Sequence, residues 1–495
     1  MAIDFGALGP EIALAVTALV VLAADLSLRG PAKQLVNPVA AAGTVVAIAL
    51  TLRLWGDERS TFGGTFVIDS LALTFKLLFL GTLLAVLGIS WRFFAEGRYF
   101  QGEYYFLIVT AFLGMVLMPS ARDLLTVFVA LETVSIPAFV MVGLRKRDLY
   151  SSEASLKFFL IGVLSVAIML LGMSLVYGFT GTTSLTGIAE AIAATQTPGS
   201  ETPLLLAAVL LIVVGFGFKV SAVPFHFWAP DTYAGAPMPV TAMLAVASKA
   251  AGFVGLTLVA FAAFAPLAGA WAPVLGVVAL ATMTVGNLGA LQQRDVVRLL
   301  AYSSVAQAGY ILLPFGVARG GTDALSLAVN QTAFRAVLLY LVAYAVMNIG
   351  AFAVVIGVAR RSGLRATADY AGLGARSPLL GGAMTVFLLS LGGAPLTVGL
   401  WAKFAIVEAL TVDVTAFGLV LAAGLVVNSV IAFFYYLRLI RGIWMEAPAE
   451  GAPVPQPGFN LSLVVVSLAA LTVVLGVLPA LVTDTTSVVT LALGR

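Results

Sequence analysis

A lysine, a proline and the only histidine of the chain lie close together at the end of an apolar run. The run starts near Pro203 and leads into Lys219, Pro224 and His226. A lysine at membrane depth costs roughly 2.5–3.5 kcal/mol on insertion scales, so such residues are rare and usually functional. A proline inside a helix frees a carbonyl, which a bilayer tolerates only against protein or a water-filled cavity. A charge beside a helix break therefore indicates an ion pathway.

The rest of the chain is built from apolar runs. The sequence of 495 residues is 61% hydrophobic and 10% charged, and runs of about 20 residues are long enough to cross a bilayer. We expect an all-α polytopic membrane protein of about 14 spans: 9–27, 38–54, 70–91, 103–118, 123–143, 154–178, 203–220, 239–264, 272–291, 300–317, 334–359, 381–410, 415–440 and 460–481. The start of the chain lacks the features of a signal peptide, so we expect the first span to be retained.

What the sequence lacks narrows the function. Without cysteine there is no thiolate-held cluster or haem, and one histidine cannot supply both axial ligands of a b-type haem. Residues 215–217 read Gly-Phe-Gly, but they lack the third glycine and the preceding strand of a dinucleotide site. We therefore expect no cofactor in this chain.

The basic residues predict an orientation. With the N-terminus outside, fifteen of the 26 basic residues fall in inner loops and six on the outer side, as the positive-inside rule requires. The other five lie within or at the ends of spans and are all lysine: Lys76, Lys157, Lys219, Lys249 and Lys403. Arginine stays charged in proteins, whereas a desolvated lysine can release its proton. Lysine is thus the residue suited to proton exchange.

A second interrupted span suggests an internal repeat. The sequence around Pro395 resembles that around Pro224, and Lys403 follows this second break. Two interrupted helices at corresponding places in two halves point to a transporter-type site, and five intervening spans make the halves inverted. We expect N-terminal helices in 1–100, a first repeat in 103–264, a second repeat in 272–443 and a C-terminal helix in 460–481. A short surface helix is expected in 179–202.

Three motifs resemble those of one family. The first reads Phe218-Lys219-x-Ser221-x-x-Pro224-Phe225-His226-x-Trp228-x-Pro230-Asp231-x-Tyr233-x-Gly235-x-Pro237-x-Pro239-Val240-Thr241-Ala242 and continues to Lys249; the second is Leu299-Leu300-Ala301-Tyr302-Ser303-Ser304-Val305-Ala306-Gln307-x-Gly309-Tyr310; the third is Tyr150-Ser151-Ser152-Glu153-Ala154-x-x-Lys157-Phe158-Phe159, followed by Tyr177-Gly178-x-Thr180-Gly181. They are similar to the antiporter-like membrane subunits of respiratory complex I and their sodium/proton-antiporter relatives. Within that family the chain most resembles the subunit N branch. It departs from the family pattern at Gln307, where many members have histidine, and at the second break, where a double proline is commoner.

The resemblance implies a function and partners. It implies a proton-translocating membrane subunit of NADH:quinone oxidoreductase in a bacterial inner (plasma) membrane, with both termini on the outer side. NAD, FMN, iron–sulfur clusters and quinone would bind to partner subunits. The partners would be other membrane subunits of complex I, related antiporter-like subunits among them, and lipids, with no nucleic acid.

The resemblance also implies a proton relay, which at matching positions comprises Glu132, Lys157, Lys219, Lys249, Lys403 and His226. Glu132 would be the ionisable partner of Lys219. Each residue has a plainer alternative. Glu132 could be a neutral acid bound by a neighbouring helix, and Lys219 part of a structural ion pair. Lys249 and Lys157 could extend along their helices to the membrane surface. His226 could simply donate a hydrogen bond at the break.

Two further residues are expected to be structural. Lys76 lies near a helix end, where we expect its side chain to reach the surface. Asp231 is expected to cap the segment after the first break, together with Pro230.

Other functional classes stay open. The chain could belong to a multisubunit cation/proton antiporter or a membrane-bound hydrogenase, or it could be a membrane scaffold. A purified complex that contains flavin and iron–sulfur clusters would favour the redox enzyme over an antiporter.

Overall fold

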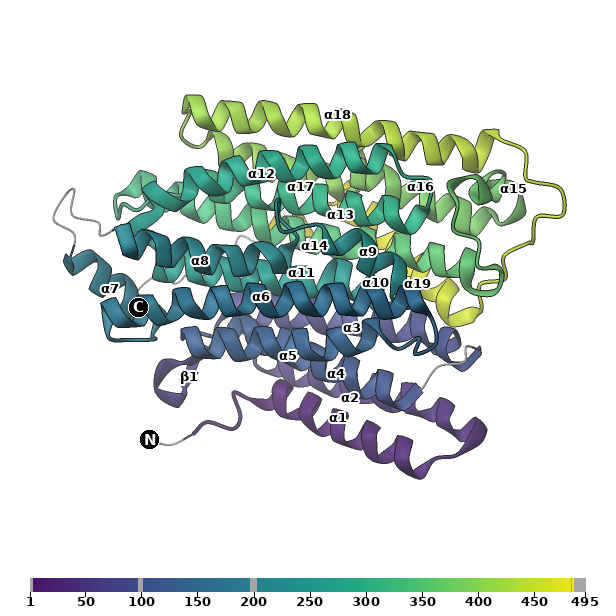
Figure 1. Cartoon of the computed structure of the whole chain (residues 1–495), viewed down its shortest axis with the longest axis horizontal. Helices are drawn as coiled ribbons and strands as arrows, with labels where there is room; N and C mark the ends of the chain where they lie inside the picture. The colour runs from purple at the N-terminus through teal and green to yellow at the C-terminus, as the bar shows by residue number, and fades with distance from the viewer. Residues whose placement is uncertain (1–2, 97–100, 196–202, 482, 485–495) are drawn as a thin grey trace.

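The architecture is that of a polytopic helical membrane protein. The computed structural model describes residues 3–96, 101–195, 203–481 and 483–484. Within these ranges, thirteen helices are long and apolar enough to cross a bilayer, and Figure 1 shows the helices packed side by side along one direction. Two further apolar helices, α16 (Pro378–Gly392) and α17 (Val398–Thr411), divide the remaining predicted span between them. The predicted fold class is confirmed.

The N-terminal part forms three long helices. They are α1 (Gly9–Ser27), α2 (Val36–Arg53) and α3 (Ser70–Glu96). Between α2 and α3 the chain makes a two-stranded antiparallel sheet of β1 (Arg59–Thr61) and β2 (Phe66–Ile68). In Figure 1 the purple helices α1 and α2 form one edge of the molecule, and α3 lies further in.

The first predicted repeat contains α4 (Gln101–Leu117), α5 (Leu124–Val142), α6 (Leu149–Thr180), α8 (Pro203–Val220) and α9 (Trp228–Gly235). The expected short helix in 179–202 is α7 (Leu185–Thr195). A continuous buried helix follows, made of α10 (Met238–Met243), a π-helical turn (Leu244–Ser248), α11 (Lys249–Leu258) and a second π-helical turn (Val259–Ala263). π-Helical turns inside α-helices often mark functional sites, and the first of these directly precedes Lys249.

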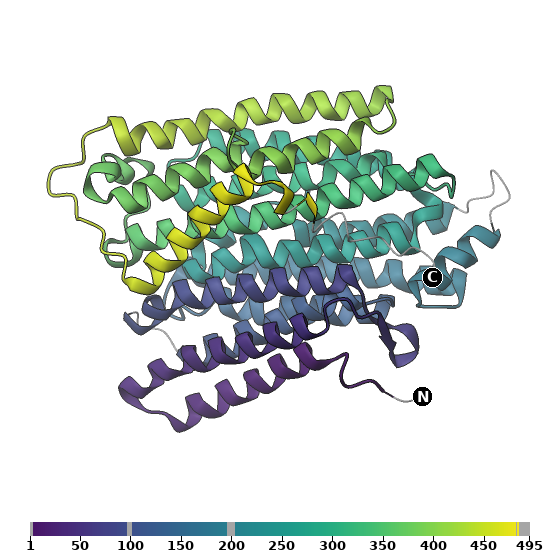
Figure 2. The same ribbon diagram turned by 180° about the vertical axis from the view of Figure 1, so that it is seen from behind.

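The second predicted repeat contains α12 (Ala268–Leu291), α13 (Val296–Leu312), α14 (Ala324–Ser362), the short α15 (Leu373–Arg376), α16, α17 and α18 (Ala416–Met445). The last helix, α19 (Phe459–Val477), crosses the others obliquely in Figure 2. It contacts α14, α16 and α17 and also α3. Helix α19 thus packs against both the second half and the N-terminal helix α3.

The same end structure occurs in both halves, at opposite faces of the bundle. Asp123 caps α5 by accepting hydrogen bonds from the amides of Leu125 and Thr126, and it forms a β-bridge with Ser184. Asp295 likewise caps α13 and forms a β-bridge with Ala366. An aspartate at this position supplies an acceptor to amides that have no partner within the helix.

The long helices before these bridges also end alike. Helix α6 is followed by the capping residue Gly181 with φ of 68°, and α14 by the capping residue Gly363 with φ of 69°. Asp123 lies at the start of α5, and Arg145 follows the other end of this helix. The bridge at Ala366 lies at the same face as Arg145, because Arg145 and Arg365 line one pocket. The two halves are therefore inverted, as predicted from the two helix breaks.

Candidate functional site

The first break separates α8 from α9. Ser221 has φ of 61°, a left-handed conformation that costs an L-residue roughly 1–2 kcal/mol. The groups freed by the break are nevertheless bonded within the protein. The amide of Val223 donates to Thr282 Oγ1 on α12 at 3.0 Å, and Trp228 Nε1 donates to the carbonyl of Phe218 at 3.1 Å. These two groups at the break thus have partners within the protein, as a membrane environment requires, whereas Pro224 and Phe227 are exposed.

The second break separates α16 from α17. Here Leu396 adopts the left-handed conformation, with φ of 66°. Ser390 Oγ accepts a hydrogen bond from the amide of Gly399 at 3.2 Å. The freed carbonyl of Gly392 accepts a hydrogen bond of 2.6 Å from Lys403 Nζ. A lysine side chain is therefore part of the structure of this break.

Lys219 lies in the last turn of α8 and is buried. Its Nζ donates a hydrogen bond of 3.0 Å to Ser135 Oγ on α5. Glu132 is three residues before Ser135, so the two share a helix face. No ion pair joins Glu132 directly to Lys219, although the two interact electrostatically. Among the described residues Glu132 Oε1 is buried without a hydrogen-bond partner. The carboxyl lines an open cavity of about 530 Å³ between α5 and α6.

Lys249 begins α11 and is fully enclosed between the two halves. Its Nζ donates to Ser304 on α13, at 2.7 Å to Oγ and 3.0 Å to the backbone oxygen. Gly252 lies one turn further along α11, on the same face as Lys249. A Cβ atom at Gly252 would stand 2.9 Å from Lys219 Cγ. Glycine therefore lets α11 pack directly against Lys219, one turn away from Lys249.

Lys403 faces the second break. Besides Gly392, its Nζ donates to Ser429 Oγ on α18 at 3.0 Å, and it lies 4.8 Å from the centre of the Tyr310 ring. Its neighbours in sequence, Trp401 and Phe404, are partly exposed on other faces of α17. Its immediate surroundings are thus more polar than the sequence around it suggests.

One face of α13 connects Lys249 with Lys403. Ser304, Gln307 and Tyr310 are spaced by three residues and so share this face. Gln307 donates to the carbonyl of Leu391 at 3.2 Å and to Tyr436 Oη at 3.3 Å, and it accepts a hydrogen bond of 2.5 Å from Tyr340. Ser304 binds Lys249, and the Tyr310 ring lies against Lys403. A buried polar stripe therefore runs between the two lysines.

This arrangement matches known proteins in sequence and fold. The model of the family described as NADH:quinone oxidoreductase/Mrp antiporter, TM matches residues 121–432. NADH-quinone oxidoreductase subunit N 2 of Roseiflexus castenholzii is 40% identical over 453 residues, which cover 90% of this chain and 88% of that protein. The chain belongs to the NADH:quinone oxidoreductase/Mrp antiporter family.

Solved structures agree with this membership. A chain of respiratory complex I from Thermus thermophilus superposes with a TM-score of 0.79 at 32% identity, covering 96% of this chain and 98% of that one. A chain of the Mrp complex from Dietzia superposes with the same TM-score of 0.79 at 20% identity, covering 98% and 97%. The second likeness shows the fold alone, since its sequence identity is low.

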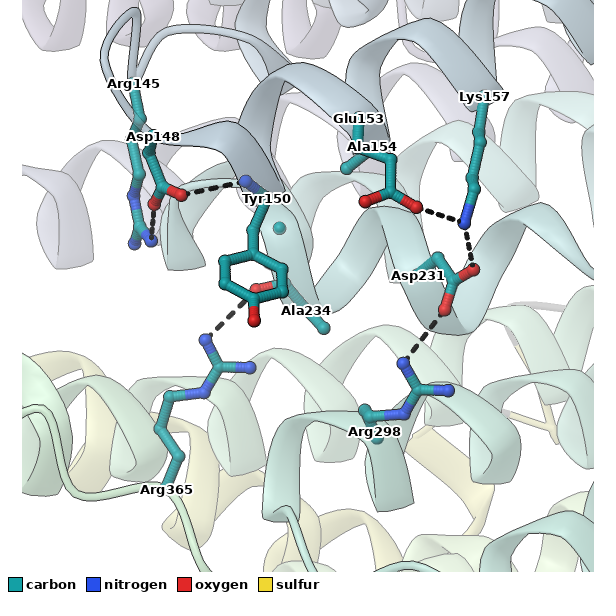
Figure 3. Close-up of a pocket in the computed structure, with 11 residues that line it drawn as sticks. Arg145, Asp148, Tyr150, Glu153, Ala154, Lys157, Asp231, Ala234, Arg298 and Arg365 are labelled. Atoms are coloured by element: carbon teal, nitrogen blue, oxygen red, sulfur yellow. Dashed lines mark hydrogen bonds and ion pairs between the residues drawn. The ribbon is translucent and has the colours of Figure 1, made fainter.

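Two residues predicted for the relay are not buried as the three lysines are, although His226 interacts electrostatically with Lys249. His226 is half-buried in the first break, and within the described part of the chain its Nδ1 has no hydrogen-bond partner. Lys157 is 44% exposed at the end of the bundle and binds Glu153 at 2.7 Å and Asp231 at 3.0 Å. It lines an open pocket of about 400 Å³ (Figure 3).

Two structural expectations were wrong. Lys76 does not reach the surface: its side chain is fully buried, with Nζ 2.7 Å from Glu11 Oε1 on α1. The reason is that Glu11 of α1 binds the amine inside the protein, and the Phe66 ring lies 4.8 Å from Nζ. Asp231 does not cap α9, whose N-terminus has no side-chain cap. Its carboxylate is bound by Lys157 and Arg298 instead, as Figure 3 shows.

Sequence reasoning missed the roles of the polar groups that contact the lysines, namely Ser135, Ser304, Ser429 and Tyr310, and of the two that bind Gln307, Tyr340 and Tyr436. The spacing of Ser135 from Glu132 and the three-residue spacing along α13 were visible signals. Ser429 and the tyrosines of α14 and α18 gave none, because helix packing alone brings them to the site. Among the described residues no cluster of three or more metal-ligating side chains occurs.

Proposed function

We propose that this chain is a proton-translocating membrane subunit of NADH:quinone oxidoreductase. Electron transfer from NADH to quinone in other subunits would drive protons through Glu132, Lys219, Lys249 and Lys403. His226 would assist at the first break. Lys157, at the open pocket, would serve proton uptake from the inner side. The sequence identity to subunit N proteins supports this assignment over other members of the family.

One observation carries the proposal. The amines of Lys219, Lys249 and Lys403 each bind a serine hydroxyl, and none of them is bonded to a carboxylate. A hydroxyl can accept a hydrogen bond from an ammonium group or donate one to a neutral amine. Ser135 and Ser304 donate to the carbonyls of Leu131 and Ala301 here, and rotation of the hydroxyl would let them donate to a neutral amine. Each site can therefore hold its lysine in both protonation states, which the buried part of the relay requires.

Glu132 would control the first step electrostatically. Two unit charges attract by roughly 4 kcal/mol at about 4 Å and an effective dielectric near 20, and by about half that at twice the distance. Because Ser135 stands between Glu132 and Lys219, a small movement of α5 against α8 changes this attraction. When the carboxylate is close, Lys219 keeps its proton; when it withdraws, the proton passes towards Lys249.

The later steps would follow the polar stripe of α13. The Gln307 amide does not bind an extra proton as a histidine ring could, but it forms hydrogen bonds that orient Tyr340 and Tyr436. We propose that these groups and intervening water connect Lys249 with Lys403, from which protons leave on the outer side. NAD, FMN, iron–sulfur clusters and quinone would be bound by partner subunits. Other membrane subunits, related antiporter-like subunits among them, would be further partners.

The alternative is a subunit of a cation/proton antiporter, because the matching family includes Mrp antiporters. Mass spectrometry of the complex purified through this chain distinguishes the two. We expect flavin- and iron–sulfur-binding subunits to copurify. A complex of membrane subunits alone, without redox centres, would contradict the proposal.

The relay predicts a large effect at Lys249. Lys249→Met should abolish most proton pumping and slow the coupled quinone reduction. Among the described residues, Lys249 is the only buried lysine with a hydrogen bond to α13, and the substitution removes its amine. Pumping by purified complexes in proteoliposomes measures this. Lys33→Met, at an exposed ion pair with Asp25, is the control and should change little. Full pumping by an assembled Lys249→Met complex would exclude this relay.

We also propose an orientation with both termini on the outer side. The loops at 144–148 and 363–366 lie at one end of the bundle, since Arg145 and Arg365 line the same pocket. As the chain has no native cysteine, Ser362→Cys should resist an impermeant thiol reagent in intact cells. Asp57→Cys, in the loop between α2 and α3, should react. Labelling of the cysteine at position 362 from outside would show that the orientation is the reverse of the proposed one.

A further inference from the structure

Helix α9 is held at its exposed end by charged groups from both halves of the protein. Asp231 gives one carboxylate oxygen to each side: Oδ2 lies 3.0 Å from Lys157 Nζ on α6, and Oδ1 lies 2.9 Å from Arg298 Nη1 on α13. Figure 3 shows this carboxylate between the two cations. Lys157 is in turn bound by Glu153. Asp231 therefore links the first half to the second half through a single side chain.

The end of α9 is fixed by a second contact with the second half. Arg365 Nη1 donates to the carbonyl of Ala234 at 3.0 Å, and Arg365 Nη2 lies 3.2 Å from Asp295. On the other side, a Cβ atom at Gly235 would stand 2.5 Å from Ala154 Cβ and 2.7 Å from the carbonyl of Tyr150. The eight residues of α9 are thus packed against α6 and bound to α13 and its neighbouring loop.

Two other side chains of α9, Trp228 and Tyr233, lie beside the buried lysines. Trp228 donates to the carbonyl of Phe218, the residue before Lys219, and stacks on Phe158 of α6 at 4.5 Å. The Tyr233 ring lies 5.7 Å from Lys249 Nζ. A displacement of α9 would therefore move groups beside both Lys219 and Lys249.

We propose that Asp231, together with Lys157 and Arg298, is an electrostatic clamp that positions α9 for proton transfer between Lys219 and Lys249. This role rests on the proposed proton relay and adds a positioning residue to it. Asp231 itself does not carry the proton in this proposal, although it binds Lys157 at the proposed uptake site. It holds the half-helix after the break against both halves at once, so that Trp228 and Tyr233 keep their places.

Asp231→Asn tests the clamp, because it removes the charge and keeps the shape. We expect proton pumping per assembled complex to fall several-fold, short of the roughly 100-fold loss that a 1 Å misplacement can cause. Asp231→Glu should recover part of the activity. Glu446→Gln, which breaks an exposed ion pair with Arg441, is the matched control and should leave pumping unchanged.

Hydrogen–deuterium exchange of the purified complexes gives a readout that does not depend on pumping. In Asp231→Asn the amides of 228–236 should exchange faster, while those of α18 should not change. In a double-mutant cycle, Arg298→Gln should add little to Asp231→Asn, because both remove the same contact. Unchanged exchange in α9, additive effects, or normal pumping with a loosened α9 would each overturn the clamp. Full pumping by Lys249→Met would instead refute the relay, whatever happens to α9.

Discussion

Replacing Lys219 by alanine is expected to stop proton transfer through this chain while most of the complex still assembles. A positioned acid–base group contributes typically 10²- to 10⁴-fold to proton transfer, so the loss should be about 100-fold or more. Glu132→Gln should reduce pumping as well, because the neutral amide no longer controls the charge on Lys219. Proton pumping per electron, measured on purified complexes in proteoliposomes, is the decisive quantity.

The contact with Ser135 provides an internal comparison for this experiment. Ser135→Ala removes the hydrogen bond to Lys219 Nζ but keeps both charges, so it should have an intermediate effect. If Lys219→Ala lowers the abundance of the complex and leaves pumping per complex normal, the lysine is structural. Removing one member of a buried charge pair destabilises a protein strongly, so abundance must be measured beside activity.

The second large effect on proton pumping is expected at Lys403. Here the result should depend on whether the new side chain can release a proton. Lys403→Arg keeps a positive charge that is not released in proteins, so pumping should be nearly lost. Lys403→Glu keeps a group that can gain and lose a proton. In its protonated form the glutamic acid can donate a hydrogen bond towards the carbonyl of Gly392, which the lysine binds at 2.6 Å. The glutamate variant should therefore pump better than the arginine variant at equal assembly.

The reverse order would give a different role to this residue. If Lys403→Arg pumps like the unaltered protein and Lys403→Glu is inactive, the second break needs a fixed positive charge beside its free carbonyl. Lys403→Met separates these cases further, since it removes both the charge and the titration while filling similar space. Proteoliposome pumping and complex abundance are again compared for all three variants.

The helices, the two breaks and the burial of Lys219, Lys249 and Lys403 could be predicted from the sequence alone. A bilayer leaves a chain few options, because each backbone polar group must find a partner within the protein. Long apolar runs therefore predict helices, and a proline such as Pro224 or Pro395 within a run predicts a break. The inversion of the two halves also followed from the number of spans between these breaks.

The partners of the charged side chains were decided by the tertiary structure. Lys76 lies near the start of its helix and could have reached the surface, but Glu11 of α1 and the Phe66 ring hold its amine inside the protein. Asp231 looked like a cap, and yet it binds cations from helices of both halves. Lys219 bonds to Ser135 rather than directly to Glu132.

These contacts could not be predicted because they join residues far apart in the chain. Apolar runs and prolines act locally, so the sequence determines which segments are helices and where they break. Which face of one helix meets which face of another depends on the packing of all the helices together. The sequence by itself determined the membrane fold and the titratable residues of this protein. Only the tertiary structure decided that Lys219, Lys249 and Lys403 each bind a serine hydroxyl, and that a polar face of α13 lies between Lys249 and Lys403.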